Sequence, residues 1–369
     1  MGVTGALAVG VLGAAGTIAP SIVRDLAESD EVASIRLLDL DGEGARRVAV
    51  QHGLGKAGLR AVDARNGFRA ALDGLDVLVN SASYRVNLEA MRASLEAGCH
   101  YLDLGGLYWQ TGRQLELDED FRGAGLLALL GIGSSPGKTN VMAVRAVREL
   151  GEPVRTIHVM AAGRDLAPPP GLSFPYALRT LVDEITLPPV VVRDGEAVEI
   201  APLAEGGTVN FGKPIGSGET IYTLHSELRT FPKSFHCQEA SFRLSLSPRV
   251  LARLRELASA PGEIDAAAGA ALPPSAKTVS VHVVEAAGET RSARVRAVTR
   301  PVERWSLGGG VVSTGAPAAA AVRLIARGRI EATGVLPPEA CVDPDELFPE
   351  LEQRGVTFQV DSREAVPAR

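Results

Sequence analysis

Short apolar runs alternate with amphipathic segments along the first 150 residues. Runs rich in Val, Leu and Ile, bounded by Gly, Asp or Asn, predict buried strands, and the segments between them have the helical period. The predicted strands are 6–12, 34–40, 59–63, 76–80, 100–104 and 126–132, and the predicted helices are 19–29, 42–52, 88–97 and 114–123. Strands separated by helices of this length are typical of parallel βαβ units with helices on both faces of a sheet.

The pattern changes after residue 150. Residues 190–200 predict a hairpin with an Asp-Gly turn, and the runs 278–285 and 291–300 predict a second hairpin. An Ala-rich, amphipathic helix is predicted over 316–328. We therefore expect an α/β fold: a doubly wound Rossmann sheet in 1–150, completed by 307–369, with an inserted α+β domain in 151–306 that carries an antiparallel sheet.

Composition narrows the class of protein. Hydrophobic residues make up 46% of the chain and charged residues 22%, which is typical of a globular protein. A net charge of -6 without a Lys/Arg run argues against a nucleic acid or an anionic membrane as partner. The uncharged segment 1–23 has no basic region that would indicate a signal peptide, and it is diluted by Gly, Thr, Ser and Pro. The three cysteines form no CxxC pair, so we expect a cytoplasmic protein with no metal site.

A glycine-rich loop after the first strand predicts a dinucleotide site. Its residues are Gly13, Ala14, Ala15, Gly16, Thr17 and Ile18, and the small Ala19 follows. Gly13 would let the chain turn, and Gly16 would let the backbone approach a pyrophosphate. The N-terminus of the next helix would then present N–H groups to the phosphates.

An acidic residue at the end of the second strand indicates which dinucleotide is bound. Asp39 lies 20 residues after Ala19, where a carboxylate would bind the adenosine ribose and repel a 2′-phosphate. This favours NAD over NADP; the alternative is that Asp39 or Asp41 only caps the turn. Asp63, after the third strand, could face the adenine. The fourth strand ends in residues expected to contact the cofactor: Asn80, Ser81 and Ala82.

Three longer motifs carry a family resemblance. The runs 80–87 (NSASYRVN), 97–106 (AGCHYLDLGG) and 131–140 (GIGSSPGKTN) resemble the saccharopine dehydrogenase superfamily, and most of all lysine 6-dehydrogenase and its relatives. Residues 222–227, 314–319 and 334–339 fit the same group. The resemblance implies hydride transfer between a nicotinamide and a carbon that bears nitrogen. It also implies a discontinuous Rossmann domain and dimerisation through the sheet of the second domain.

Candidate substrate-binding residues lie near two predicted strand ends. Lys138, Thr139 and Asn140 follow a Pro-Gly turn, where N–H groups and side chains could bind a carboxylate; the alternative is a plain strand-to-helix turn. Arg85 could clamp a carboxylate, and Tyr84 could carry a proton or simply pack. Asp103, at the end of the fifth strand, could touch the cofactor or cap the next helix.

His225 and Glu227 are the candidate proton carriers. They lie two residues apart in a segment of alternating pattern, which predicts that both side chains lie on one face of a strand. A histidine and a carboxylate on one face can form a general base and the group that orients it. The alternative is a solvated or interface pair.

The sequence predicts an NAD-dependent oxidoreductase that deaminates lysine or a lysine-like amine, as a homodimer or higher homo-oligomer. Two alternatives stay open: a saccharopine-type reductase that joins an amine to a keto acid, and a nucleotide-sensing Rossmann protein without turnover.

Overall fold

The computed structural model describes residues 6–65 and 67–364, which form two compact units. The first unit comprises 1–138 and 311–354, and the second comprises 139–310 and 355–369. These limits differ from the predicted 1–150, 151–306 and 307–369. The helix that begins at Lys138 continues into the second unit, and the last strand joins the sheet of that unit.

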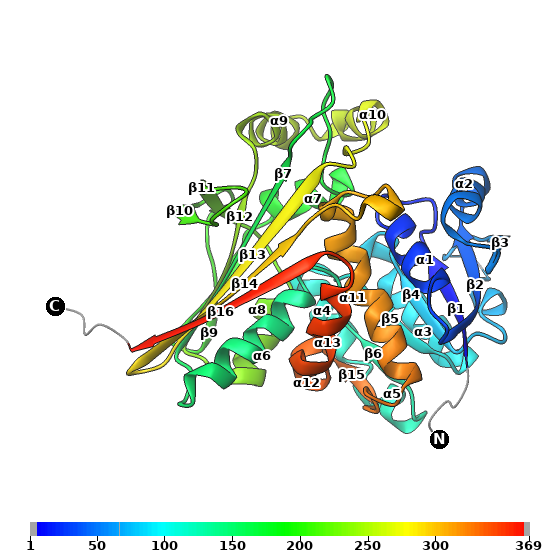
Figure 1. Ribbon diagram of the computed structural model, residues 1–369, viewed down its shortest axis with the longest axis horizontal. Helices are drawn as coiled ribbons and strands as arrows, with labels where there is room; N and C mark the ends of the chain where they lie inside the picture. The colour runs from blue at the N-terminus through cyan, green and yellow to red at the C-terminus, as the bar shows by residue number, and fades with distance from the viewer. Residues whose placement is uncertain (1–5, 66, 365–369) are drawn as a thin grey trace. The chain divides into compact units, whose positions relative to one another are not determined.

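The first unit is built on a seven-stranded parallel sheet (Figure 1). Its strand order is β15-β6-β5-β4-β1-β2-β3, so the order 3-2-1-4-5-6 of a Rossmann fold is extended by a strand from the C-terminal segment. The strands are β1 (Leu7–Leu12), β2 (Val32–Asp39), β3 (Ala57–Ala61), β4 (Val77–Asn80), β5 (His100–Asp103), β6 (Leu127–Leu129) and β15 (Gly334–Leu336). The doubly wound sheet predicted from the sequence is confirmed.

The helices of this unit follow the predicted alternation. They are α1 (Ala19–Ala27), α2 (Gly42–His52), α3 (Asn87–Ala97), α4 (Leu107–Leu115), α5 (Asp118–Gly123), α11 (Gly309–Ala326), α12 (Pro338–Cys341) and α13 (Pro344–Glu352), with α6 (Lys138–Leu150) leading into the second unit. The single helix predicted over 114–123 is wrong, because the chain breaks at Leu117 and α5 restarts there. Three acidic residues in the first turn of α5 suit a helix N-terminus.

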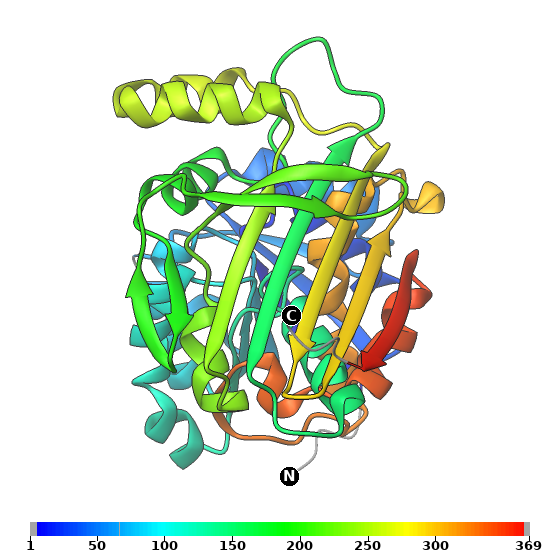
Figure 2. The ribbon, with the colours of Figure 1, turned by 90° about the vertical axis from the view of Figure 1, so that its left-hand side faces the viewer.

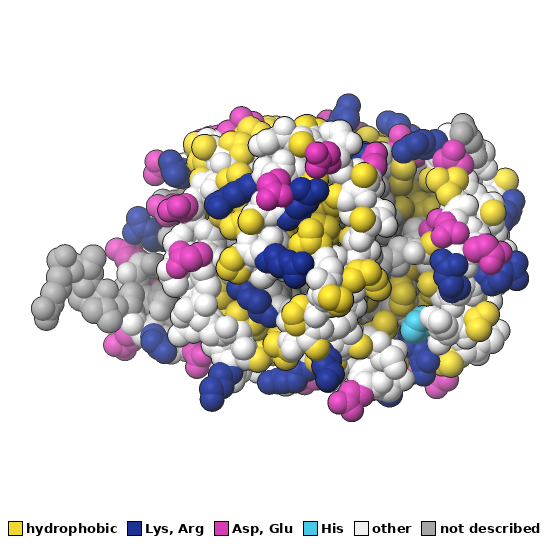
Figure 3. Space-filling view, turned by 90° about the horizontal axis from the view of Figure 1, so that it is seen from above, with side chains coloured by type: hydrophobic (Ala, Val, Ile, Leu, Met, Phe, Trp, Pro, Cys, Tyr) yellow, Lys and Arg dark blue, Asp and Glu magenta, His cyan; other side chains and the backbone are white. Residues whose placement is uncertain are grey.

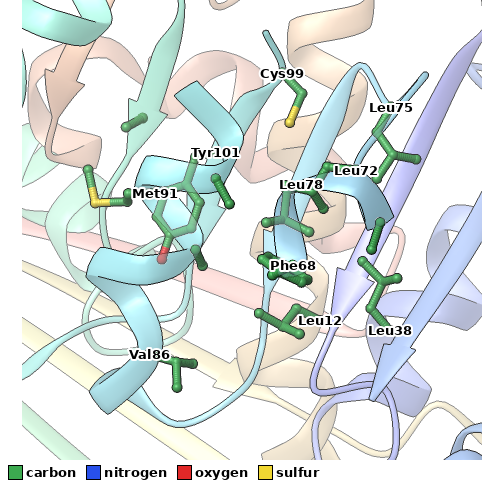
Figure 4. Packing of buried hydrophobic residues seen from close by; sticks show 14 of the residues in the cluster. Leu12, Leu38, Phe68, Leu72, Leu75, Leu78, Val86, Met91, Cys99 and Tyr101 are labelled. Atoms are coloured by element: carbon green, nitrogen blue, oxygen red, sulfur yellow. The ribbon is translucent and has the colours of Figure 1, made fainter. Parts of the chain in front are cut away.

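Apolar side chains from the strands and from the segment before β4 form a core of the first unit. Figure 4 shows Leu12 of β1 and Leu78 of β4 beside Phe68. Leu38 of β2 belongs to the same cluster and is fully buried. This packing fixes the carboxyl ends of three neighbouring strands, which is where a parallel sheet of this kind binds its ligand.

Helix α11 is buried on most of its surface, whereas an amphipathic helix was predicted over 316–328. By length and composition it could cross a membrane, but 83% of the apolar stretch is buried in the protein. A helix that is apolar all round is typical of a core.

The second unit contains a mixed sheet with the order β10-β11-β12-β7-β13-β14-β16 (Figure 2). The long strands are β7 (Thr156–Asp165), β12 (Glu239–Ser245), β13 (Thr278–Ala287), β14 (Arg291–Thr299) and β16 (Val356–Glu364). The sheet is not purely antiparallel as predicted, because β12 runs parallel to β7. Parallel neighbours need a long crossover, and the chain between these two strands contains two helices, α7 (Leu178–Thr186) and α8 (Glu227–Phe235).

Both predicted hairpins are confirmed, and a third pair of strands was missed. Residues 190–200 form β8 (Val190–Arg193) and β9 (Glu196–Glu199), and β13 pairs with β14. The missed strands, β10 (Glu205–Asn210) and β11 (Ser217–Tyr222), make a ribbon that crosses one face of the sheet (Figure 2). Side chains of the sheet hold it, as where Arg296 Nε donates to Phe211 O at 2.6 Å.

Two further helices complete the second unit, α9 (Pro248–Ser259) and α10 (Ile264–Ala270). On the face seen in Figure 3, basic and acidic side chains lie interspersed rather than gathered by sign. On α9, Arg253 Nη1 and Glu256 Oε2 form an ion pair 2.8 Å apart.

Candidate functional site

The loop between β1 and α1 is a tight turn against the neighbouring strands. Gly13 has φ +78°, and a Cβ atom there would lie 2.5 Å from Ala82 N, so only glycine fits. Gly13 N donates to Leu38 O of β2 at 2.9 Å, and Gly16 N donates to Gly13 O at 3.0 Å. Gly16 and Thr17 are exposed. The start of the loop at Gly13 is therefore held in place, whereas Gly16 and Thr17 are open to solvent, as a phosphate-binding loop requires.

Helix α1 begins directly after this loop. Ala14, Ile18 and Ala19 are buried, which lets the helix pack closely on the sheet. In the described chain no side chain caps this helix, since the N-cap is Ile18 and Pro20 lies in the first turn. The first N–H groups of such a helix lack helical partners and suit an anion.

Asp39 fixes the loop from the end of β2. Its Oδ2 accepts a hydrogen bond from Ala15 N at 2.8 Å, and its Oδ1 accepts one from Asp41 N at 2.9 Å. Asp41 caps α2, accepting from Gly44 N at 2.9 Å. Both aspartates thus bind main-chain N–H groups around this turn, and a contact of Asp39 with the ribose stays a prediction. Asp63 closes its own turn by accepting from Arg65 N at 2.9 Å.

The residues after β4 join this strand to β1. Ser81 Oγ donates to Leu12 O at 2.8 Å, and Ala82 N donates to Asn80 Oδ1 at 3.0 Å. Asn80 itself is buried and donates to Tyr101 OH at 3.0 Å. Asn80, Ser81 and Ala82 therefore shape the sheet edge beneath Gly13, and any contact they make with a cofactor stays a prediction.

The carboxylate of Asp103 is buried and binds several main-chain and side-chain groups of the protein. Its Oδ1 accepts from Gly105 N at 2.9 Å and from Gly131 N at 2.7 Å. Its Oδ2 accepts from Gln114 Nε2 at 2.6 Å and from Tyr101 OH at 3.1 Å. Burial raises its pKa above the ordinary range. Asp103 thus positions the loops after β5 and β6, a role that the sequence did not predict.

Tyr84 and Arg85 lie in a short 3-10 turn that follows β4. The Arg85 guanidinium carbon is 4.8 Å from the centroid of the Tyr84 ring, a cation–π distance. Arg85 is exposed and Tyr84 is half-buried. Both follow the carboxyl end of β4, and their roles in substrate binding and proton transfer stay predictions.

Lys138, Thr139 and Asn140 are all buried at the start of α6. Lys138 Nζ donates to Ser313 Oγ at 2.7 Å, and burial lowers the pKa of Lys138 to about 7. Thr139 Oγ1 donates to Glu227 Oε1 at 2.8 Å. Lys138 and Thr139 therefore bind protein groups in this structure, and the substrate-carboxylate role predicted for this turn stays a prediction.

His225 and Glu227 are paired in the second unit, but not on a strand. Strand β11 ends at Tyr222, and Glu227 begins helix α8, so the predicted strand is wrong. An acidic residue is favoured in the first turn of a helix, which explains the change of structure. The side chains still meet: His225 Nδ1 is hydrogen-bonded to Glu227 Oε2.

The pair is enclosed on several sides. The His225 ring stacks on Phe242 of β12, with centroids 3.5 Å apart and an interplanar angle of 17°. Burial works to lower the pKa of His225, but the charge of Glu227 and its hydrogen bond raise it overall. Burial likewise opposes ionisation of Glu227, whose pKa the charge of His225 nevertheless holds low. A buried imidazole with an orienting carboxylate has the arrangement of a general base.

The sequence analysis missed a second buried carboxylate, Glu184 of α7. Tyr176 OH donates to Glu184 Oε2, and Leu224 N donates to Glu184 O at 3.0 Å. Burial raises the pKa of Glu184 to about 7. The available signal was a charged residue among the apolar positions Leu181 and Ile185 of one helix.

Comparisons with known proteins agree with the first unit's fold. Residues 9–129 match the model of the saccharopine dehydrogenase NADP-binding domain. A carboxyaminopropylagmatine dehydrogenase from Synechocystis sp. is 28% identical over 193 residues. That alignment covers 50% of this chain and 48% of the relative, so it spans about half the length of each.

The whole chain also matches a solved structure. An apo saccharopine dehydrogenase (L-Glu forming) from Saccharomyces cerevisiae superposes with a TM-score of 0.72 at 14% identity. The match covers 97% of this chain and 100% of that one, and it shows a shared fold. The predicted resemblance to the saccharopine dehydrogenase superfamily is thereby confirmed: residues 9–129 match the model of the NADP-binding domain, and the chain shares the fold of the yeast enzyme.

Proposed function

We propose that this protein is an NAD(P)-dependent oxidoreductase that acts at the C–N bond of an amine substrate. The observation that carries the proposal is the buried chain of hydrogen bonds from Thr139 through Glu227 to His225. The glycine loop with its uncapped helix supports the cofactor class. The family of residues 9–129 and the amine-derived name of the Synechocystis relative support the reaction class.

Each group of this chain has a stated part in the proposed reaction. The N–H groups of the loop and of α1 bind the pyrophosphate, and Asp39 holds the loop in place. The bound nicotinamide supplies or accepts the hydride. His225 takes the proton from the substrate nitrogen, so that the nitrogen lone pair is free when the C–H bond breaks.

The orientation of His225 follows from its neighbours. Glu227 Oε2 binds Nδ1, which fixes the ring and leaves Nε2 to exchange the proton with the substrate. Thr139 occupies the other oxygen of Glu227, so this carboxylate cannot rotate away without losing a buried hydrogen bond.

Within this class we propose a lysine-like terminal amine as the substrate and NAD as the cofactor. The acidic residues at and after the end of β2, Asp39, Asp41 and Glu43, support NAD, because they would repel a 2′-phosphate. The name of the Synechocystis relative favours a second candidate, a substrate built on agmatine.

An activity assay separates these possibilities. The protein is incubated with NAD or NADP and a panel of lysine, agmatine, their carboxyalkylated derivatives and acidic amino acids, and reduction is followed at the nicotinamide absorbance. We expect cofactor reduction with a cationic amine and little with an acidic amino acid. If every amine fails in both directions of the reaction while the cofactor binds, the protein is a nucleotide-binding protein without this activity.

A further inference from the structure

His225 lies in an environment with two carboxylates rather than one. Glu227 is bonded to its Nδ1, and Glu184 raises the pKa of His225 by its charge. The main-chain bond from Leu224 N to Glu184 O ties the segment just before His225 to α7. The side chains of Glu184, His225 and Glu227 are all buried.

Neutral side chains from three other segments also pack against this group. Strand β12 contributes Phe242, α6 contributes the hydroxyl of Thr139, and the segment before α7 contributes the hydroxyl of Tyr176. Asp183, the neighbour of Glu184 on α7, adds a further negative charge that raises the pKa of Glu184. The charges of two buried carboxylates, Glu227 and Glu184, therefore act on one imidazole.

We infer that Glu184, held by Tyr176, is a positioning residue that sets the proton affinity of His225 in the proposed reaction. This inference rests on the proposed role of His225 as the base. An ionised Glu184 stabilises the imidazolium, so His225 keeps its proton to a higher pH than a histidine paired with Glu227 alone. Burial raises the pKa of Glu184 to about 7, and the hydrogen bond that Tyr176 OH donates works against burial by favouring the ionised carboxylate.

The direction of the effect follows from the charges. The pKa of His225 is raised above 6.5, and a base must be neutral to accept a proton, so turnover should rise with pH through that pKa. Glu184→Gln keeps the size and the acceptor for Tyr176 but removes the charge. His225 would then lose its proton at a lower pH, and the rising limb would move down by about one pH unit.

The first measurement is independent of activity. NMR titration of protein labelled at the His Cε1 carbon gives the pKa of His225, whose signal is assigned with His225→Asn. We expect a downward shift in Glu184→Gln and a smaller downward shift in Tyr176→Phe. Asp183→Asn is the matched control, because it removes the same charge one residue away on α7. If Glu184→Gln titrates like wild type or like Asp183→Asn, the inference is overturned.

The second measurement separates this inference from the proposed function. The pH profile of turnover is recorded for wild type and Glu184→Gln, with thermal melting to confirm that each variant is folded. If the rising limb of the pH profile moves with the pKa of His225, the result supports both the inference on Glu184 and the role of His225 as the base. If NMR shows the shift and the kinetic limb stays in place, the coupling stands and His225 is not the base. If Glu184→Gln does not fold, the smaller shift in Tyr176→Phe decides the inference.

Discussion

A buried histidine is useful as a base only if its neighbours fix both its orientation and its charge. His225 receives both from the protein, because Glu227 binds its Nδ1 and Phe242 covers one face of the ring. Burial alone would lower the pKa of His225, but the charge and hydrogen bond of Glu227 and the charge of Glu184 raise it overall. The consequence is an imidazole that holds its proton more tightly than a buried histidine without these carboxylates would.

Replacing His225 tests that role directly. His225→Asn keeps the approximate size but cannot take a proton near neutral pH, so we expect turnover to fall by about 100- to 10,000-fold. Cofactor affinity should stay at the wild-type level, since the phosphate loop belongs to the first unit. Arg85→Lys is the contrast: it should weaken apparent substrate affinity, because the planar fork is lost while the charge remains. A His225→Asn enzyme with wild-type turnover would place the base elsewhere.

Asp39 is the residue proposed to discriminate between NAD and NADP. Its carboxylate binds Ala15 N, so Asp39→Asn can keep this acceptor while removing the charge. We expect wild type to bind NAD more tightly than NADP, and the variant to gain NADP affinity by about tenfold as the repulsion of the 2′-phosphate is lost. Calorimetry with both cofactors measures this. A wild-type preference for NADP would contradict the proposed role of Asp39.

At the scale of elements, local patterns were enough for the Rossmann unit but not for the site in the second unit. Period-2 and period-3.6 patterns predicted β1, α2 and β4 to within two residues, because these elements repeat one simple unit. The two-residue spacing of His225 and Glu227 suggested a strand, but helix α8 begins at Glu227. Glu184 could not be predicted as their neighbour, since its contact depends on the folding of distant segments.

The phosphate loop gives an element-scale prediction. Gly13→Ala should destabilise the protein, because a positive φ costs about 1–2 kcal/mol and the Cβ would overlap Ala82 as well. Gly55→Ala is the matched control, since Gly55 has φ +80° and no atom within 4 Å of its Cβ position. Chemical denaturation should show the larger loss in Gly13→Ala.

A substitution at Gly16, unlike one at Gly13, should affect cofactor binding rather than stability. Gly16 is exposed, and a Cβ atom there would approach only Gly13 O, at 3.0 Å. Gly16→Val should therefore keep nearly wild-type stability and lose cofactor affinity by more than about tenfold, because the side chain would fill the space of the pyrophosphate. If Gly16→Val binds the cofactor normally, the loop has been assigned wrongly.

At the scale of the whole chain, the first unit depends on a segment that returns from far along the sequence. Residues 311–354 rejoin residues 1–138 after the long segment 139–310 of the second unit. Strand β15 pairs with β6, and a buried ion-pair network joins α1, α11 and α13. The sequence predicted the return of the chain but not this network, because scattered arginines are usual on a solvated surface.

The buried ion pairs of Arg323 are expected to contribute to the stability of the protein. Arg323 is almost fully buried; its Nη1 donates to Asp25 Oδ1 at 2.8 Å and its Nε donates to Glu350 Oε2 at 2.7 Å. Arg323→Ala leaves two carboxylates with fewer partners in the interior, and we expect the free energy of unfolding to fall by about 3 kcal/mol. Arg329→Ala is the control, since Arg329 and Glu346 are exposed and 3.7 Å apart, and a pair of this kind contributes less than about 1 kcal/mol. Equal losses in the two variants, measured by urea denaturation, would show that the buried network does not hold the returning segment in place.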